Sequence, residues 1–410
     1  MVRHCRFCSS ELRRSFCDLG MSPFSNSYLT AEQLGASERF YPLHALVCET
    51  CWLVQLPEYE KPDSIFSDYA YFSSYSDSWL AHARAYVDAM ILRFGYGPAT
   101  RVMEIASNDG YLLQYFKARG VPVLGIEPAA NVAAVAETAG IPTLVEFFGR
   151  KTASALVARG ESADLLLGNN VLAHVPDLND FVAGMKIALR RGGVITMEFP
   201  HLLRLIEGNQ FDTIYHEHFS YLSLTTVERV FAAHGLAIFD VQELTTHGGS
   251  LRIFARHAED DGIAIDAAVP RLKRREAEAG LTDIAVYDAF AEHVKETKFR
   301  LVEFLIAARR AGKRVWGYGA PAKGNTLLNF CGIRTDLLEC TVDRSPHKQG
   351  RYLPGTHVPI REPEAIRAAR PDYLLVLPWN LKDEIVDQMG YIRDWGGRFV
   401  LPIPQVEVLS

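Results

Sequence analysis

Four cysteines near the start of the chain, arranged as two Cys-x-x-Cys pairs, constrain its fold more than any other feature. The pairs are Cys5/Cys8 and Cys48/Cys51, separated by residues 9–47. Each such turn directs two thiolates at one point, so two turns together build a closed tetrahedral S4 site that suits zinc. A closed site has no position for water, which predicts a structural metal in a small N-terminal domain. The alternatives are four reduced cysteines or a redox pair.

The remaining cysteines and the composition predict a cytoplasmic protein of several domains. Seven cysteines are an odd number, and the residues after Met1 lack the apolar stretch of a signal peptide, which argues against a disulfide framework. Cys17 is expected to be buried as an apolar residue. The chain has 410 residues and a net charge of −6, the wrong sign for a nucleic-acid partner, and no apolar run approaches the roughly 20 residues that cross a membrane. The oligomeric state is open, and a monomer is compatible with the sequence.

Periodicity divides the chain into three blocks. Residues 1–78 form the cysteine block, whereas 79–265 and 266–410 each alternate expected strands with expected helices. Such alternation builds parallel sheets, so the fold class is α/β, with two Rossmann-like domains after the zinc-binding domain. The expected strands are 101–105, 123–126, 165–167, 194–198, 314–318, 338–342, 373–377 and 398–401. The expected helices include 79–94 and 281–312, the second with one apolar face formed by Phe290, Val294, Thr297, Leu301 and Leu305.

A candidate ligand site follows the first strand of the central block, at Glu-Ile-Ala-Ser-Asn-Asp-Gly (104–110). Glu127 ends the next strand, where an acid can accept both ribose hydroxyls. A dinucleotide needs glycines for close approach of its pyrophosphate, but two of the three glycine places hold Ala106 and Asn108. This pattern disfavours NAD and favours S-adenosylmethionine, which has a cationic end; the alternative is an ordinary strand–turn–helix. The candidate cofactor-binding residues are Glu104, Ser107, Asn108, Gly110, Glu127, Asn169 and Asn170.

The fourth strand of the central block supports the same ligand. It ends in Asn169 and Asn170 and is followed by His174. Amides and an imidazole therefore stand where a methyl donor would meet its acceptor. A tight turn at 192–193 then leads into another strand. This order resembles the class I S-adenosylmethionine-dependent methyltransferases, and the resemblance covers the central block.

The segment Tyr215-His216-Glu217-His218 gives the sharpest indication of chemistry. Four polar tips in succession are costly to bury without partners. A histidine of near-neutral pKa, beside a glutamate that orients it, suits general acid–base catalysis. A His-x-His pair can also bind a metal, although only two imidazoles and one carboxylate are local. A hydrogen-bonded structural network is the third alternative.

Taken together, these motifs resemble the nucleotide-sugar C-methyltransferases that act on deoxysugars such as the precursors of tetronitrose and kijanose. The resemblance spans essentially the whole chain, because a Gly-Tyr-Gly-Ala-Pro-Ala-Lys-Gly-Asn-Thr loop at 317–326 adds to the motifs above. It implies C3-methylation of a dTDP-linked 4-keto-deoxysugar in antibiotic biosynthesis, with S-adenosylmethionine as the donor.

The resemblance also implies catalytic roles for Tyr69, His174, Tyr215, Glu217 and His218. His218 is expected to remove the C3 proton, with Glu217 orienting it or tuning its pKa, and Tyr215 is the alternative base. Tyr215 and His174 would hydrogen-bond the ketone or enolate oxygen. Tyr69 would position the sugar from the first domain.

The loop at 317–325 is expected to hold the diphosphate of the nucleotide sugar. It follows a strand and opens a helix, where free N–H groups and the helix dipole attract phosphate. Lys323 adds a positive charge, Asn325 adds a donor, and Asp343 at the end of the next strand could hold a nucleoside hydroxyl. The candidate substrate-binding residues are Lys323, Asn325, Gly319, Asp343 and Arg252, the last in a segment that could close the cleft.

Three rival functions are compatible with parts of the sequence. An NAD-dependent nucleotide-sugar oxidoreductase or epimerase would use the third block, although its glycine pattern is incomplete. A zinc-ribbon adaptor would bind nucleic acid or protein, which the net charge of −6 disfavours. An O- or N-methyltransferase would share the donor site, and only analysis of the product separates it from a C-methyltransferase.

Overall fold

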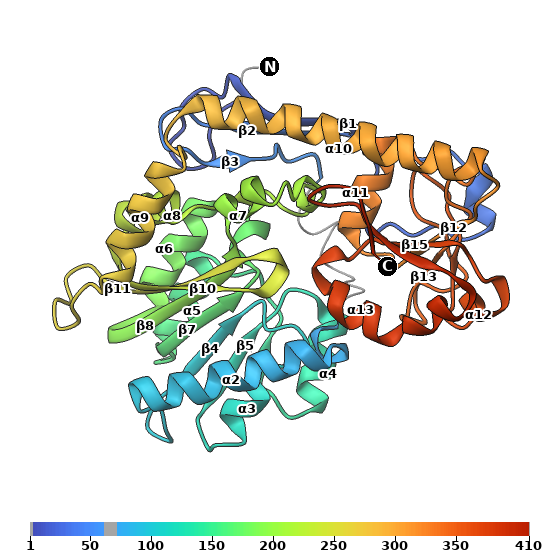
Figure 1. The fold of residues 1–410 in the computed structure, drawn as a ribbon. Coiled ribbons are helices and arrows are strands. Elements are labelled where there is room, and N and C mark those ends of the chain that lie inside the picture. Colours follow the sequence, from blue (N-terminus) through green and yellow to red (C-terminus); the bar gives the residue numbers. More distant parts are fainter. Residues whose placement is uncertain (1–2, 61–71, 410) are drawn as a thin grey trace.

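The computed structural model describes residues 3–60 and 72–409. These residues form three β-sheets, which follow the order of the three blocks except for one strand (Figure 1). A long helix, α10 (Ile284–Arg310), lies along the N-terminal sheet and extends to the C-terminal domain. Within the described ranges, no helix combines the length and the apolar character needed to span a membrane.

The N-terminal sheet is antiparallel and has the strand order β1-β2-β3-β9. Three of its strands, β1 (Arg14–Ser22), β2 (Tyr41–Val47) and β3 (Val54–Gln55), come from the first block. The fourth strand, β9 (Ser220–Tyr221), comes from the second block and begins two positions after His218. The N-terminal domain therefore completes its sheet with the segment that follows the Tyr-His-Glu-His motif.

The central sheet has the strand order β10-β11-β8-β7-β4-β5-β6. From β8 to β6 the strands are parallel, as expected, but β11 is antiparallel to both β8 and β10. The expectation of a parallel sheet therefore missed an antiparallel hairpin at one edge. The strands are β4 (Val102–Ile105), β5 (Val123–Ile126), β6 (Thr143–Leu144), β7 (Ala163–Asn169), β8 (Leu189–Pro200), β10 (Leu236–Leu244) and β11 (Ser250–His257). The helices are α2 (Asp77–Phe94), α3 (Leu113–Lys117), α4 (Ala130–Thr138), α5 (Arg150–Ala158), α6 (Leu178–Ala188), α7 (Leu202–Glu207) and α8 (Leu224–Ala233), and the 3-10 turns are η2 (Ser73–Tyr75), η3 (Leu172–His174), η4 (Phe211–Thr213) and η5 (Thr246–Gly248).

The C-terminal sheet has the order β14-β13-β12-β15-β16-β17 and is parallel except for its last strand. Its strands are β12 (Val315–Tyr318), β13 (Thr341–Val342), β14 (Ile360–Arg361), β15 (Tyr373–Val376), β16 (Arg398–Leu401) and β17 (Glu407–Leu409). The third block also contains α9 (Ala268–Glu278), α11 (Ala322–Cys331), α12 (Ala365–Ala369), α13 (Lys382–Gln388) and the 3-10 turns η6 (Trp379–Leu381) and η7 (Gly390–Trp395), and the first block contains η1 (Glu32–Gly35). The predicted α/β class with two Rossmann-like domains is confirmed.

The apolar face predicted for the long helix is confirmed, because all five of its predicted residues are buried in α10. Phe290 stacks on Phe16 of β1 with ring centroids 4.6 Å apart, and Tyr287 meets the edge of the same ring at 5.8 Å. One continuous apolar core extends from β1 through α10 to α11. The helix therefore joins the N-terminal sheet to the C-terminal domain by burial of apolar surface.

We predict that Phe290→Ala lowers the free energy of unfolding by about 3–5 kcal/mol, because it leaves a cavity beside Phe16. Phe299 is on the same helix but 56% exposed. Phe299→Ala is therefore the matched control and should change stability by less than about 0.5 kcal/mol. Chemical denaturation measures both variants. Equal stability of the two would contradict the assigned packing of α10.

Candidate functional site

The four predicted metal ligands come together in the N-terminal domain. The Sγ atoms of Cys5, Cys8, Cys48 and Cys51 all lie within 4.8 Å of one another. The two turns have the same backbone, since Cys5 N–H donates to the Ser10 carbonyl and Cys48 N–H donates to the Leu53 carbonyl. In each turn the residue after the second cysteine, Ser9 or Trp52, has a left-handed conformation.

This donor set fits zinc. Four sulfurs in a closed, mostly buried cluster satisfy the ligand number and type of a structural zinc site. Cys17 lies apart from the cluster on β1, where burial raises the pKa of its thiol to about 12, as expected for a residue in an apolar core. When bound, zinc would hold the two turns together, and the domain has no need of it for chemistry.

The loop after β4 has an unusual backbone. Ala106 and Asn108 occupy glycine places of the dinucleotide pattern, and both have left-handed φ values, 56° and 51°. The carboxylate of Glu127, at the end of β5, accepts hydrogen bonds from Asn108 N–H at 3.0 Å and from Ala129 N–H at 2.9 Å. Glycine is required at position 110, because its φ of 78° is left-handed and a Cβ atom there would lie 2.9 Å from the side chain of Ile141. The loop is thus held in a strained conformation of the kind that accumulates at ligand sites.

Two acidic side chains and one serine hydroxyl of this loop are buried. Glu104 is fully buried, and among the described residues neither of its carboxylate oxygens has a hydrogen bond of normal geometry. Ser107 Oγ and Asp109 Oδ1 are likewise buried without such a partner in that part of the chain. Burial raises the pKa of Glu104 well above its ordinary value, and the hydroxyl of Tyr111 opposes the shift. Unpaired oxygens of this kind fit a ligand with a cationic end, as in S-adenosylmethionine, and do not fit a pyrophosphate.

Asn169 and Asn170, at the end of β7, connect this loop to the turn between β10 and β11. Asn169 donates to the hydroxyl of Tyr111 at 3.3 Å. Asn170, with a left-handed φ of 54°, donates to Nε2 of His247 at 2.9 Å. Trp79 at the start of α2 contacts both Tyr111 and His247 through its ring. Both predicted asparagines are therefore in place at the carboxyl end of β7.

Three of the predicted catalytic rings form one cluster. The rings of Tyr215 and His218 have centroids 3.9 Å apart, and His174 meets His218 at 4.7 Å in an edge-to-face arrangement. Nδ1 of His218 donates to the Thr213 carbonyl at 2.8 Å. Burial lowers the pKa of His218 well below its usual value, and the neighbouring His174 lowers it further. Burial also lowers the pKa of His174 to about 4, against a hydrogen bond to the backbone of Glu217.

Glu217 lies in the same segment but has a different partner from the one expected. Its carboxylate accepts a hydrogen bond from the amide of Asn26 at 2.7 Å, so Asn26 of the first block holds it. The backbone carbonyl of Thr213 orients His218, which corrects the prediction that Glu217 does so. Burial raises the pKa of Glu217 to about 7, and the bond from Asn26 opposes the rise. Tyr69, the remaining predicted catalytic residue, lies outside the described residues.

The two residues predicted to bind the diphosphate, Lys323 and Asn325, have different surroundings. The ammonium of Lys323 donates to Asn380 and lies 4.4 Å from the centre of the Trp379 ring, whose N–H donates to Asp212 at 2.7 Å. Burial lowers the pKa of Lys323 to about 8, and Asp212 opposes the shift. Lys323 therefore faces the central domain. Asn325, only 1% exposed, has no hydrogen-bond partner for its side-chain amide among the described residues.

Gly319 and Asp343 support the loop at the end of β12. A Cβ atom on Gly319 would lie 2.6 Å from Pro378, so close packing of the loop requires this glycine. The carboxylate of Asp343 accepts hydrogen bonds from Ala320 N–H at 2.7 Å and from Ser345 N–H at 2.8 Å. Both residues therefore have structural duties at the place where the nucleotide was expected.

Arg252, which the sequence predicted to bind the substrate, forms an ion pair within the central domain. It is 5% exposed on β11 and donates to the carboxylate of Glu198 at 2.7 Å. Its guanidinium also lies 4.6 Å from the centre of the Tyr86 ring. Glu198 further accepts hydrogen bonds from His82 and Thr246, so this ion pair joins α2 to the edge hairpin.

Sequence reasoning missed four residues that shape the site: Asn26, Asp212, Thr213 and Trp379. The position of Asp212 and Thr213 just before the Tyr-His-Glu-His motif was the available signal for those two. Nothing in the local sequence marks Asn26 or Trp379, because each acts on a residue far away in the chain.

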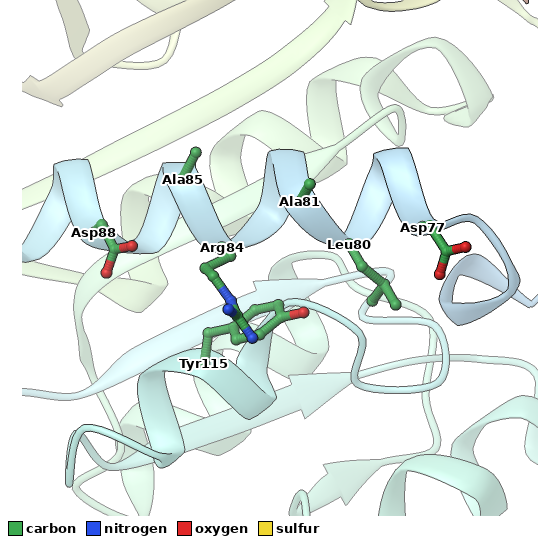
Figure 2. Close-up of a pocket in the computed structure, with 7 residues that line it drawn as sticks. All are labelled: Asp77, Leu80, Ala81, Arg84, Ala85, Asp88 and Tyr115. Carbon is green, nitrogen blue, oxygen red and sulfur yellow. The ribbon is translucent and has the colours of Figure 1, made fainter. Parts of the chain in front are cut away.

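A surface depression of about 370 Å³ lies between α2 and α3, away from these clusters (Figure 2). Its lining residues are Asp77, Leu80, Ala81, Arg84, Ala85, Asp88 and Tyr115. Arg84 lies over the ring of Tyr115 at 5.1 Å, so the side chains at its centre already contact each other. None of the predicted site residues lines it, and we assign no function to it.

Three family models match successive parts of the chain. Residues 5–66 match a family described as "Putative zinc binding domain", and residues 79–241 match a methyltransferase domain. Residues 245–404 match the C-methyltransferase C-terminal domain. The order of the three matches follows the order of the three sheets.

A full-length relative is the C-methyltransferase NovU of Streptomyces niveus, with 35% identity over 409 residues that cover 100% of this chain and 97% of that protein. Solved structures match less of the chain. An S-adenosylmethionine-dependent methyltransferase of Mesorhizobium loti covers 43% of this chain and 100% of its own, with 15% identity and a TM-score of 0.35. The magnesium protoporphyrin IX methyltransferase of Synechocystis PCC 6803 covers 44% and 81%, with 14% identity and a TM-score of 0.34.

We predict that Cys48→Ala abolishes stoichiometric zinc binding and lowers the free energy of unfolding by more than about 4 kcal/mol, because one ligand of the closed site is lost. Cys17→Ala is the matched control and should keep its zinc. Elemental analysis and thermal denaturation measure the two effects. Full zinc content in the Cys48 variant would refute the assigned ligand set.

We predict that Glu127→Ala raises the Kd for S-adenosylmethionine about 10- to 100-fold, since hydrogen bonds to a charged group contribute about 1.5–3 kcal/mol. Glu137 is an exposed glutamate on α4. Glu137→Ala is therefore the control and should bind the donor normally. Isothermal titration calorimetry gives both constants. Unchanged affinity in the Glu127 variant would place the ribose elsewhere.

Proposed function

Because the chain belongs to the family of C-methyltransferase NovU, we propose that it methylates C3 of a dTDP-linked 4-keto-deoxysugar. The chain is an S-adenosylmethionine-dependent C-methyltransferase with a structural zinc site. The nucleotide sugar, the C3 position and a role in deoxysugar formation for an antibiotic are the proposed part. The proposed location is the cytoplasm.

One observation supports the proposal above the others. His174 follows Asn170 closely in the sequence, its ring contacts that of His218, and the ring of His218 contacts that of Tyr215. The candidate donor residues and the candidate acid–base residues therefore share the carboxyl end of β7. A carbon to be methylated must lose a proton close to the methyl donor, and this arrangement provides for both needs in one place.

His218 is the proposed base. Its Nδ1–H is engaged with the Thr213 carbonyl, which leaves the lone pair of Nε2 to accept a proton. Because burial holds the pKa of His218 well below its usual value, the ring is neutral at pH 7 and ready to act. The C4 ketone acidifies the C3 proton. Nε2 would take that proton, the electrons of the C3–H bond would form a C3=C4 double bond, and the π electrons of the C4 ketone would move onto its oxygen.

Tyr215 and His174 are the proposed partners of that oxygen. Both rings contact or adjoin His218, so a ketone placed for proton removal would lie within their reach. Donors already directed at a developing oxyanion stabilise it without reorganisation. Tyr215 remains the alternative base, and Tyr69 is the proposed contact with the sugar from the first domain.

The donor and nucleotide ends have separate proposed binding residues. S-adenosylmethionine supplies, when bound, a methyl group on a positively charged sulfur that an electron-rich carbon can take up. Glu127 would hold its ribose, and the acidic side chains around the 104–110 loop would hold its cationic end. Lys323 and the side-chain amide of Asn325, which has no hydrogen-bond partner among residues 3–60 and 72–409, are proposed for the diphosphate, and Asp343 for the nucleoside. An NAD-dependent nucleotide-sugar oxidoreductase or epimerase remains the alternative, although the glycine pattern of this loop is incomplete for a dinucleotide.

The test is incubation of a dTDP-4-keto-deoxyhexose with the enzyme and S-adenosylmethionine in deuterated water. A product heavier by one methylene, with the new methyl group on C3 by NMR, is the expected result. Deuterium at C3 without methylation would mean that the natural acceptor differs. A methyl group on oxygen or nitrogen would overturn C-methylation of this substrate.

We predict that His218→Ala lowers the rate of methylation about 10²- to 10⁴-fold and leaves the Kd for S-adenosylmethionine unchanged, because only the base is lost. His216, two positions earlier, donates to the Pro42 carbonyl at 3.3 Å among aromatic rings of the first block. His216→Asn is therefore the control and should retain most of the activity. Normal turnover by the His218 variant would transfer the role of base to Tyr215.

A further inference from the structure

The arginine inside the first Cys-x-x-Cys turn extends out of the zinc domain. Arg6 lies between Cys5 and Cys8. Its Nη1 donates to the Pro176 carbonyl at 3.0 Å and to the Val175 carbonyl at 3.4 Å, both in the central domain. Its Nη2 donates to the carbonyl of Leu56. One guanidinium thus joins two segments that are far apart in the sequence.

The turn itself is held in return. The side-chain amide of Asn179, on α6, donates to the carbonyls of Arg6 and Phe7 at 3.1 Å and 3.0 Å. Gln55 on β3 accepts a hydrogen bond from Arg6 N–H at 2.9 Å and donates to the sulfur of Cys5 at 3.2 Å. The position of the Arg6 backbone is therefore fixed by the metal-binding turn, by β3 and by α6 together.

Both histidine-bearing segments converge on this arginine. Val175 and Pro176 follow His174 directly, and the guanidinium of Arg6 lies 5.4 Å from the ring centre of Phe219, the residue after His218. Phe219 N–H donates to the Ala173 carbonyl at 2.7 Å, and Leu56 N–H donates to the Phe219 carbonyl at 3.0 Å. Each residue that the guanidinium of Arg6 contacts is therefore within two positions of His174 or His218, or is hydrogen-bonded to the backbone of such a residue.

We propose that Arg6 is a positioning residue that transmits the geometry of the cysteine site to the His174–His218 pair. The inference rests on the catalytic roles proposed above for these two histidines. A guanidinium suits this task because its planar fork can donate to several carbonyls in fixed directions while its face covers an aromatic ring. A lysine has one compact donor head and cannot reproduce that geometry.

This role gives the N-terminal metal a second effect besides stability. A metal bound by Cys5 and Cys8 fixes the two residues that flank Arg6, and hence the point from which the guanidinium reaches the central domain. An error of about 1 Å in the placement of a catalytic group can lower a rate about 100-fold. The cysteine site is thus connected to catalysis through one side chain, although its metal is expected to take no part in the chemistry.

The test compares Arg6→Ala and Arg6→Lys with Arg13→Ala, a change to an exposed arginine of the same domain that pairs with Glu11. Zinc content and the Kd for S-adenosylmethionine should be unchanged in all three variants, because the thiolates and the donor loop are intact. Both Arg6 variants should lower kcat about 10- to 100-fold with little change in the KM of the donor. Full activity in Arg6→Lys would overturn the requirement for a guanidinium fork.

A second measurement needs no substrate. Diethyl pyrocarbonate modifies neutral imidazoles, and mass spectrometry gives the rate at each histidine. The rates at His174 and His218 should change several-fold in Arg6→Ala, whereas those at the exposed His293 and His347 should stay the same. Unchanged rates at His174 and His218 would overturn the proposal. Changed rates with an inactive wild-type enzyme would uphold the positioning and reject the proposed substrate, so the two failures are distinguishable.

Discussion

A two-residue strand pairing connects the metal-binding turns to the proposed acid–base cluster. β3 pairs with β9 at Val54/Tyr221 and Gln55/Ser220. β3 follows the second cysteine pair, and β9 begins just after His218, so a short backbone ladder joins the two sites. A slip of one residue in a ladder moves every side chain to the opposite face. The backbone just after His218 is therefore held by the N-terminal domain, which links that domain to the proposed acid–base cluster.

The features that the sequence predicted well are those with a local signal. Two cysteine pairs with matched spacing identified their ligand set because each turn is specified by four consecutive residues. The buried face of α10 followed from helical spacing, and the strands β4, β5, β7, β12, β15 and β16 followed from short apolar runs before turns. Glu127 at the end of β5 and the asparagines at the end of β7 could also be placed, because parallel strands present their carboxyl ends at one edge.

The features that could not be predicted are partnerships between distant residues. Asn26 lies 191 positions from Glu217, and Arg252 lies 54 positions from Glu198. A glutamate next to a histidine in the sequence is a reasonable partner for it. In the structure, however, His218 donates to the Thr213 carbonyl, and the carboxylate of Glu217 accepts a hydrogen bond from Asn26 instead. Likewise, the hairpin of β10 and β11 follows a sheet whose other connections are parallel. Which distant group fills each position is decided by three-dimensional packing, on which local periodicity carries no information.

Burial gives the site its electrostatic character. It lowers the pKa of His174 to about 4 and that of His218 well below its usual value, which favours the neutral form of both imidazoles. It also lowers the pKa of Lys323 to about 8, which leaves this ammonium charged, with Asp212 opposing the shift. The charge of Lys323 acts on the pKa of His218, so it is within electrostatic reach of the cluster. Coulomb attraction is several times stronger away from bulk water. Negative charge that develops on a substrate oxygen would therefore meet a neutral base and a retained cation, and the burial that costs folding energy is what prepares both.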